Sequence, residues 1–218
     1  MRLLFLLSMG GCCLPDGLIG GGSSGEALDV GESRPVVTRS RSITELINPG
    51  SQQGRPDPPM EVITRSQCSE ITDGGSVDAQ GITGRIECGE QLVGHTRGGV
   101  QAFDTRFYEK HFCTPATTDH NGGDERIYRL SVPEGRLRPW VTLDTPCADL
   151  DLTVIKWSDR ALPTKESSVA DCEMFPKDGT TREIVDVTSD RATEWLIVVE
   201  GKGSEEGAFG LTVQCMPW

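Results

Sequence analysis

The chain has 218 residues and a formal net charge of −12 at pH 7, with a sequence pI of about 4.7. Such an acidic chain repels phosphate backbones, which argues against nucleic-acid binding, and it argues against adsorption to anionic lipid headgroups through a basic patch. No run of about twenty apolar residues occurs, so the sequence predicts no membrane-spanning helix.

Residues 1–12 have the order of a signal peptide: a positive charge at Arg2, an apolar run, and small residues before Cys12. The end of this leader, Met-Gly-Gly-Cys, resembles the lipobox of bacterial lipoproteins. That resemblance implies that Cys12 becomes the new N-terminus and carries acyl chains that hold the protein at a membrane. Because Cys13 and not an aspartate follows, the expected destination is the outer membrane or cell surface. A plain secretory leader is the alternative.

Residues 13–67 are rich in Gly, Ser, Pro and charged side chains and show little apolar periodicity. A segment of this composition buries too little apolar surface to offset the entropy of ordering its chain. We therefore predict a disordered tether between the lipid and a folded domain. A short docking peptide for a partner is the alternative that the composition leaves open.

From Cys68 to Trp218 the apolar residues alternate with a period of two. Near the C-terminus, Phe209, Leu211 and Val213 share one face of a predicted strand. Residues 193–201, TEWLIVVEG, are almost continuously apolar, as expected for a central strand covered on both faces. Further strands are predicted within residues 126–132, 140–145, 148–157 and 182–188. No convincing amphipathic helix intervenes, so we predict an all-β antiparallel sandwich or jelly roll.

Three stretches within residues 88–215 resemble the bacterial pre-peptidase C-terminal domain. They are CGEQLVGHT with GGDERIYRLSVPEG, then VTLDTPCADLDLTVIKW, and last ATEWLIVVEGKGSEEGAFGLTVQC. The resemblance implies a jelly-roll β-sandwich that accompanies secreted enzymes or surface proteins without doing their chemistry. Residues 68–87 lie outside the likeness and are expected to form an extra strand or a loop stapled on by Cys68.

Six cysteines in the predicted domain indicate a disulfide framework in an oxidising compartment. They are Cys68, Cys88, Cys113, Cys147, Cys172 and Cys215. Six cysteines allow fifteen connectivities, and only Cys147 with Cys172 is expected here, because they flank one hairpin-like unit. The stretch that resembles the family holds an odd number of cysteines, so Cys68 is expected to reach into it from outside.

Two groups of side chains raise the question of a metal. The loop TDHNGGDE offers oxygen ligands for calcium at Asp119, Asn121, Asp124 and Glu125. An ordinary turn before a strand is the favoured interpretation of that loop. His111, Cys113 and His120 match no common zinc spacing, and in an exported chain a disulfide is the expected fate of Cys113.

No catalytic site is predicted. Asp149, Asp151 and Thr153 match the Asp-x-Asp-x-Thr motif of haloacid-dehalogenase-type phosphotransferases. That fold needs a parallel sheet with crossover helices, so we interpret these residues as the outward polar face of a strand. No Ser-His-Asp or Cys-His arrangement is legible, and most of the three histidines are expected at the surface or in turns.

The sequence therefore favours a non-catalytic, exported, lipid-anchored surface protein with a structural or binding role. The alternative is an accessory module that binds a polysaccharide or a protein, with or without calcium, in the service of a secreted enzyme. A hydrolase is a third class, and two facing carboxylates with raised pKa values in a pocket would indicate it. Trp157 and Trp218 are the tryptophans expected to be exposed, where an aromatic ring can stack on a sugar.

Overall fold

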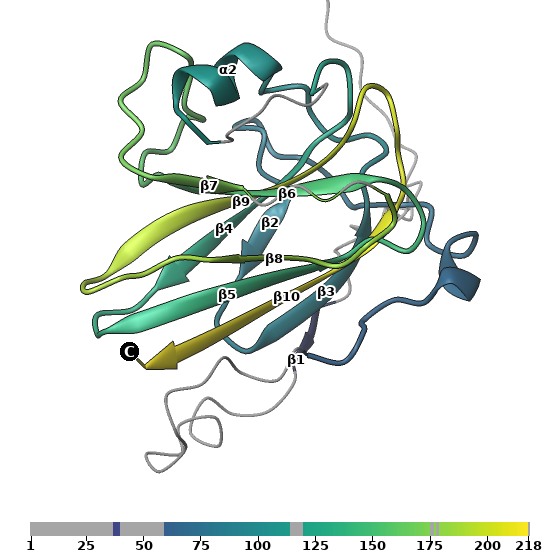
Figure 1. Cartoon of the computed structure of the whole chain (residues 1–218), viewed down its shortest axis with the longest axis horizontal. Coiled ribbons are helices and arrows are strands. Elements are labelled where there is room, and N and C mark those ends of the chain that lie inside the picture. Colours follow the sequence, from purple (N-terminus) through teal and green to yellow (C-terminus); the bar gives the residue numbers. More distant parts are fainter. Residues whose placement is uncertain (1–36, 40–58, 114–119, 175–176, 178, 218) are drawn as a thin grey trace, which may run out of the picture. The chain divides into compact units, whose positions relative to one another are not determined.

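The computed structural model describes residues 37–39, 59–113, 120–174, 177 and 179–217 (Figure 1). Nearly all of their regular structure is β-strand, arranged in two five-stranded sheets. One sheet has the order β1 (Val37–Arg39), β3 (Glu90–His95), β10 (Ala208–Pro217), β5 (Leu137–Asp144) and β8 (Glu183–Asp186). The other has the order β2 (Gly84–Ile86), β4 (Arg126–Val132), β9 (Thr193–Gly201), β6 (Leu150–Lys156) and β7 (Cys172–Met174). Within these residues no helix is long and apolar enough to cross a bilayer.

Strands β3 to β10 follow the path of a jelly roll. Counted from β3, the first, eighth, third and sixth strands form one sheet, and the second, seventh, fourth and fifth form the other. All neighbours in these two sets are antiparallel. Strands β1 and β2 extend one edge of each sheet, and β2 runs parallel to β4. The predicted all-β jelly-roll sandwich is therefore confirmed.

The second sheet packs against a hydrophobic core on each of its two faces. The first lies between the sheets and includes Leu92, Tyr128, Val141, Leu143, Leu152, Trp195, Ile197, Leu211 and Val213. The second lies on the outer face of the β2–β4–β9–β6–β7 sheet, under α2 (Thr105–Lys110) and neighbouring loops, as Figure 1 shows. In β9, Trp195, Ile197 and Val199 enter the first core, while Leu196 and Val198 enter the second. This double burial confirms the prediction of a strand covered on both faces.

Helix α2 is one of the elements that the sequence did not predict. It begins after Asp104, whose side chain accepts the Phe107 N–H at 2.8 Å and so caps the first turn. Phe107 and Tyr108 are buried, and they pack on the outer face of the sheet. A helix of six residues is too short to show a helical apolar period, which explains the omission.

The ordered contacts of the domain begin before Cys68, within the segment predicted as a tether to residue 67. Ile63 is buried, and the Val62 N–H donates to Asp144 Oδ2 at 3.0 Å. Strand β10 makes room for this segment at Gly210, where a Cβ would lie 2.7 Å from Val62 Cβ. A 3-10 turn at Arg65–Gln67 follows. One isolated buried isoleucine gives no periodic pattern, so the sequence did not reveal these contacts.

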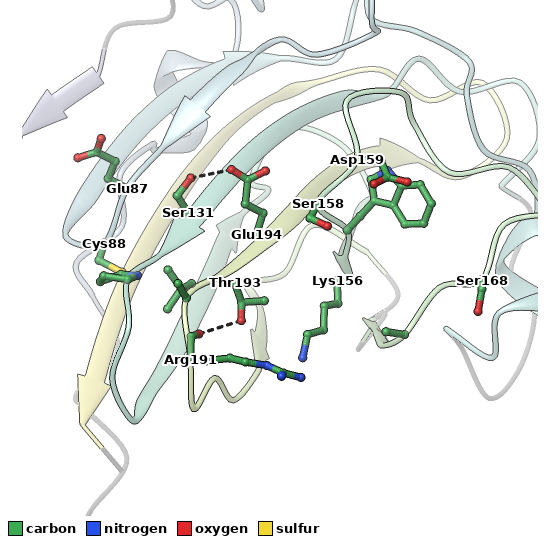
Figure 2. Close-up of a pocket in the computed structure, with 15 residues that line it drawn as sticks. Glu87, Cys88, Ser131, Lys156, Ser158, Asp159, Ser168, Arg191, Thr193 and Glu194 are labelled. Atoms are coloured by element: carbon green, nitrogen blue, oxygen red, sulfur yellow. Dashed lines mark hydrogen bonds between the residues drawn. The ribbon is translucent and has the colours of Figure 1, made fainter.

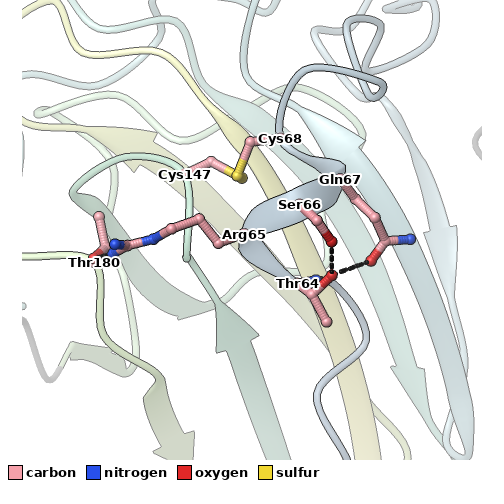
Figure 3. The surroundings of a disulfide bond; sticks show 7 residues. All are labelled: Thr64, Arg65, Ser66, Gln67, Cys68, Cys147 and Thr180. Atoms are coloured by element: carbon pink, nitrogen blue, oxygen red, sulfur yellow. Dashed lines mark hydrogen bonds between the residues drawn. A yellow bond between two sulfur atoms is a disulfide. The ribbon is translucent and has the colours of Figure 1, made fainter.

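All six cysteines of the domain form disulfides: Cys68–Cys147, Cys88–Cys215 and Cys113–Cys172. Cys68 therefore does reach into the sandwich from outside, and Figure 3 shows its bond to Cys147 beside the turn that holds Arg65. The expected Cys147–Cys172 pairing is wrong. Cys147 precedes the start of β6, whereas Cys172 lies opposite Ile155 near the other end of the same strand.

Candidate functional site

Two buried carboxylates face each other on the outer face of the second sheet. Asp151 of β6 and Glu200 of β9 are partners in the strand register, and their side chains are 0% and 1% exposed. Directly opposed side chains lie within about 4.5 to 5.5 Å of each other at Cβ, so two negative charges there repel. The pair therefore needs a positive charge or a proton.

His120 supplies that charge. Its Nδ1 lies 3.0 Å from Glu200 Oε1, and its Nε2 lies 3.9 Å from Asp151 Oδ2. The Tyr108 ring of α2 covers the imidazole edge-on, with ring centroids 5.0 Å apart. Burial alone would lower the pKa of His120, but the hydrogen bond and charge of Glu200, with the charge of Asp151, outweigh it and raise the pKa. These contacts therefore favour the protonated form of the His120 imidazole.

Glu183 of β8 joins this cluster from the first sheet. Its carboxylate accepts the Leu152 N–H at 2.8 Å and the Lys177 N–H at 2.6 Å. Burial raises the pKa of Glu183 to about 8, and the charge of Asp151 adds to the shift. Burial likewise raises the pKa of Asp151 to about 6, although the charge of His120 opposes it. Because these two acids interact, their titrations are coupled, and both favour the protonated form more than an exposed carboxyl does.

Facing carboxylates with raised pKa values are the feature that would indicate a hydrolase, yet this cluster is enclosed. His120, Asp151, Glu183 and Glu200 are all buried, and none of them lines the two surface hollows that are described below. The expectation of an outward polar face for Asp151 is therefore wrong, because α2 and its loops cover that face. We interpret the cluster as a buried polar network that fixes α2 and its neighbouring loops to the sheet.

Two of the calcium candidates are engaged by protein N–H groups. Both carboxylate oxygens of Glu125 accept backbone N–H groups, from Ala102 at 2.9 Å and Phe103 at 2.8 Å. Its side chain is buried, and burial followed by the charge of Glu200 raises the pKa of Glu125 to about 9. Asp124 Oδ2 accepts the N–H of the Gly98 turn at 2.9 Å.

The remaining candidates do not complete a calcium site. Asn121 Nδ2 donates to Thr105 Oγ1 at 3.2 Å, and Asp119 lies outside the described residues. Among the residues that the structure describes, no group of three or more His, Cys, Asp or Glu side chains is placed to hold a metal ion. The calcium hypothesis therefore gains no support from Asn121, Asp124 and Glu125. Cys113, which was considered as a zinc ligand, forms a disulfide with Cys172. Cys12, the candidate for lipidation, lies outside the described residues.

A surface groove of about 880 Å³ opens where β4, β9 and β6 meet the loops beyond them (Figure 2). Pro133, Trp157, Ala170 and Ala192 supply an apolar wall. Four hydroxyl side chains also line it, those of Ser131, Ser158, Ser168 and Thr193. Trp157 is half-buried, and its Nε1 donates to the Ala161 carbonyl at 2.7 Å, which fixes the indole. Apolar surface beside fixed polar groups is the usual make-up of a ligand-binding groove.

Two cations reach into this groove. Figure 2 shows Lys156 and Arg191 extending toward the same part of it. Lys156 Nζ lies 5.5 Å from the centre of the Trp195 ring, a cation–π contact that leaves its charge available. The lining also holds three acids, Glu87, Asp159 and Glu194, and Glu194 is engaged by Arg129 at 3.5 Å. The sequence did not predict this groove, because its residues come from strand ends and loops that are far apart in sequence.

Comparison with known proteins finds solved structures that are similar to this chain. One of them is the pre-peptidase C-terminal domain of a collagenase from Bacillus anthracis, which is 12% identical and has a TM-score of 0.38. The similarity covers 63% of this chain and 100% of that one. No family model matches the chain, and no curated protein matches it. The family of that collagenase domain is the one that the three sequence motifs resemble.

Proposed function

We propose that the chain is a non-catalytic, exported module whose groove beside Trp157 binds a polysaccharide or protein ligand. The groove carries the proposal, because it combines an apolar wall, hydroxyl side chains and two cations on one accessible surface. The enclosed His120 cluster supports the non-catalytic role, since its acids and base are buried. The three disulfides are consistent with export.

Blocking the groove tests this proposal. Ala192 is exposed and lines the groove, so Ala192→Trp is expected to fill it without disturbing the core. The matched control is Ala79→Trp, at an exposed turn residue outside the groove. In a panel of soluble polysaccharides and peptides measured by calorimetry, we expect the blocked variant to lose about tenfold or more in affinity. Unchanged binding by Ala192→Trp, or no binding of any panel member by the wild type, would refute the groove as the site.

We further propose that the leader ends in a lipidated Cys12, which would hold the module at the outer membrane or cell surface. In a bacterial host fed labelled palmitate, the wild-type chain is expected to incorporate label and Cys12→Ala to lose it. The neighbouring Cys13→Ala serves as the control and should keep the label. Label that persists in Cys12→Ala would show that the anchor is elsewhere.

A further inference from the structure

A second hollow of about 580 Å³ lies next to the groove, between α2 and the loop at residues 164–168. Three of its lining side chains are cations, namely Arg106, Lys110 and Lys165, and Glu166 is its one acid. Ser167 and Ser168 complete the lining. In a chain with a net charge of −12, such a local excess of positive charge is an exception to the rest of the composition.

The cations of this hollow are close together but are not neutralised by the described part of the protein. Arg106 and Lys110 are exposed and stand four positions apart on α2, where side chains lie one above the other. Like charges at this spacing repel and weaken a short helix. None of Arg106, Lys110 and Lys165 forms an ion pair with a carboxylate among the described residues. An anionic ligand would relieve this repulsion.

The two walls of the hollow are fixed to each other. Lys165 stands in a turn closed by the Ser167 N–H to the Thr164 carbonyl at 3.0 Å. His111, at the end of α2, contacts that same carbonyl through Nε2 at 3.1 Å. The Cys113–Cys172 disulfide ties the chain just after α2 to β7. The cations are therefore presented by a pre-formed frame, which lowers the entropic cost of binding.

Ser168 lines both the hollow and the groove, so the two adjoin at this residue. The three cations of the hollow are followed by Lys156 and Arg191 of the groove, where the lining also holds Glu87, Asp159 and Glu194, and Arg191 Nε lies 4.0 Å from Asp190 Oδ1. We call these five residues, Arg106, Lys110, Lys156, Lys165 and Arg191, the basic strip. Positive charge spread along an extended surface is complementary to a polymer that repeats its negative charge.

We propose that the basic strip binds an acidic polysaccharide whose repeating anion is a uronate carboxylate. This inference rests on the proposed function and names the class of ligand. Arginine and lysine pair with carboxylates, the serine and threonine hydroxyls match sugar hydroxyls, and the Trp157 wall offers an apolar surface to the C–H face of a sugar ring. An acidic protein segment is the competing occupant, and it is an outcome that the experiment distinguishes.

The experiment compares polygalacturonate with its fully methyl-esterified form, which has the same backbone and no charge. The wild-type chain is expected to bind polygalacturonate at least about tenfold more tightly than the ester, and to lose this preference as salt is raised. The triple variant Arg106→Gln, Lys110→Gln, Lys165→Gln should lose about tenfold or more in affinity for polygalacturonate.

The control variant is Arg65→Gln, Arg97→Gln, Arg136→Gln, which removes the same charge from exposed positions outside the strip and should bind as the wild type does. Equal binding of the ester, or equal loss in both triple variants, would overturn the basic strip while leaving the groove as a binding site. Tighter binding of polyglutamate than of polygalacturonate would overturn the polysaccharide assignment in favour of an acidic protein. No binding of any polymer by a wild type that also fails the wider panel would refute the proposed function itself.

Discussion

Raising the pH from 5 to 9 is expected to lower the free energy of unfolding by about 3 kcal/mol or more. Burial raises the pKa values of Asp151, Glu183 and Glu125 to about 6, 8 and 9. In the unfolded chain these carboxyls ionise near pH 4. The folded state therefore holds protons that the unfolded state has lost, and this stabilisation disappears as the pH rises through each folded pKa. His120 acts in the same direction, because its pKa is also raised.

Urea denaturation at pH 5, 7 and 9 measures this effect. Asp151→Asn removes one of the two opposed carboxylates, so its stability should depend less steeply on pH between 5 and 7. Asp186→Asn is the control, because Asp186 is a surface residue paired with Arg138 and its loss should leave the slope unchanged. A wild-type stability that is constant or rises between pH 5 and 9 would contradict the buried cluster as described.

Removing the Cys88–Cys215 disulfide is expected to cost about 3 to 5 kcal/mol of folding stability. The two cysteines are 127 residues apart in sequence, so the bond restricts the unfolded chain more than the other two disulfides do. Cys215 packs against the core between the sheets. The variant is therefore Cys88→Ala with Cys215→Ala, because serine would place a hydroxyl group without a hydrogen-bond partner there. The core itself is unchanged, so the variant should still fold at 25 °C.

Thermal and urea unfolding under non-reducing conditions provide the measurement. The comparison variant is Cys113→Ala with Cys172→Ala, whose cysteines are 59 residues apart in sequence. Its loss of stability is expected to be smaller than that of the Cys88–Cys215 variant, by a few tenths of a kcal/mol to about 1 kcal/mol. Reducing agent should lower the stability of the wild type. It should lower the stability of either variant by a smaller amount, because each variant has one disulfide fewer to lose. A loss below about 1 kcal/mol for the Cys88–Cys215 pair would show that the closed loop is restricted by other contacts in the unfolded chain.

The strands and the sandwich could be predicted from sequence because their signal is local. Phe209, Leu211 and Val213 alternate within one strand, and all three enter the core between the sheets. The continuous apolar run of β9 correctly predicted burial on both faces, although nothing local showed what covers the outer one. The cover is α2, whose six residues are too few to reveal a period.

The buried cluster could not be predicted, because its pairs are set by the tertiary structure. His120 meets Glu200 and Asp151 only when β6 and β9 lie side by side. For this reason the sequence indicated no partner for His120, expected most of the histidines at the surface or in turns, and assigned Asp151 to an outward face. One signal was present: charged residues at positions 151 and 200 interrupt apolar strands, which is costly unless they are paired. The disulfide pairing was missed for the same reason, since Cys68 and Cys147 meet only in the folded domain.

The basic strip could not be predicted from the amino-acid composition either. A net charge of −12 argues against binding a polyanion when charge is averaged over the whole chain. The fold gathers Arg106 and Lys110 from α2, Lys165 from a turn, and Lys156 and Arg191 from the ends of two strand regions. The charge of the hollow beside α2 therefore differs in sign from the average, and only the tertiary arrangement reveals it.

Hydrogen–deuterium exchange of the full chain, with and without the tightest-binding polymer of the panel, is the most direct test of the central claim that ligands bind on this outer surface. Protection is expected at residues 105–110, 156–170 and 191–194, which carry the groove and the basic strip. The strands β3, β10, β5 and β8 of the other sheet should exchange at unchanged rates. Protection confined to that other sheet, with none at the groove, would contradict the account.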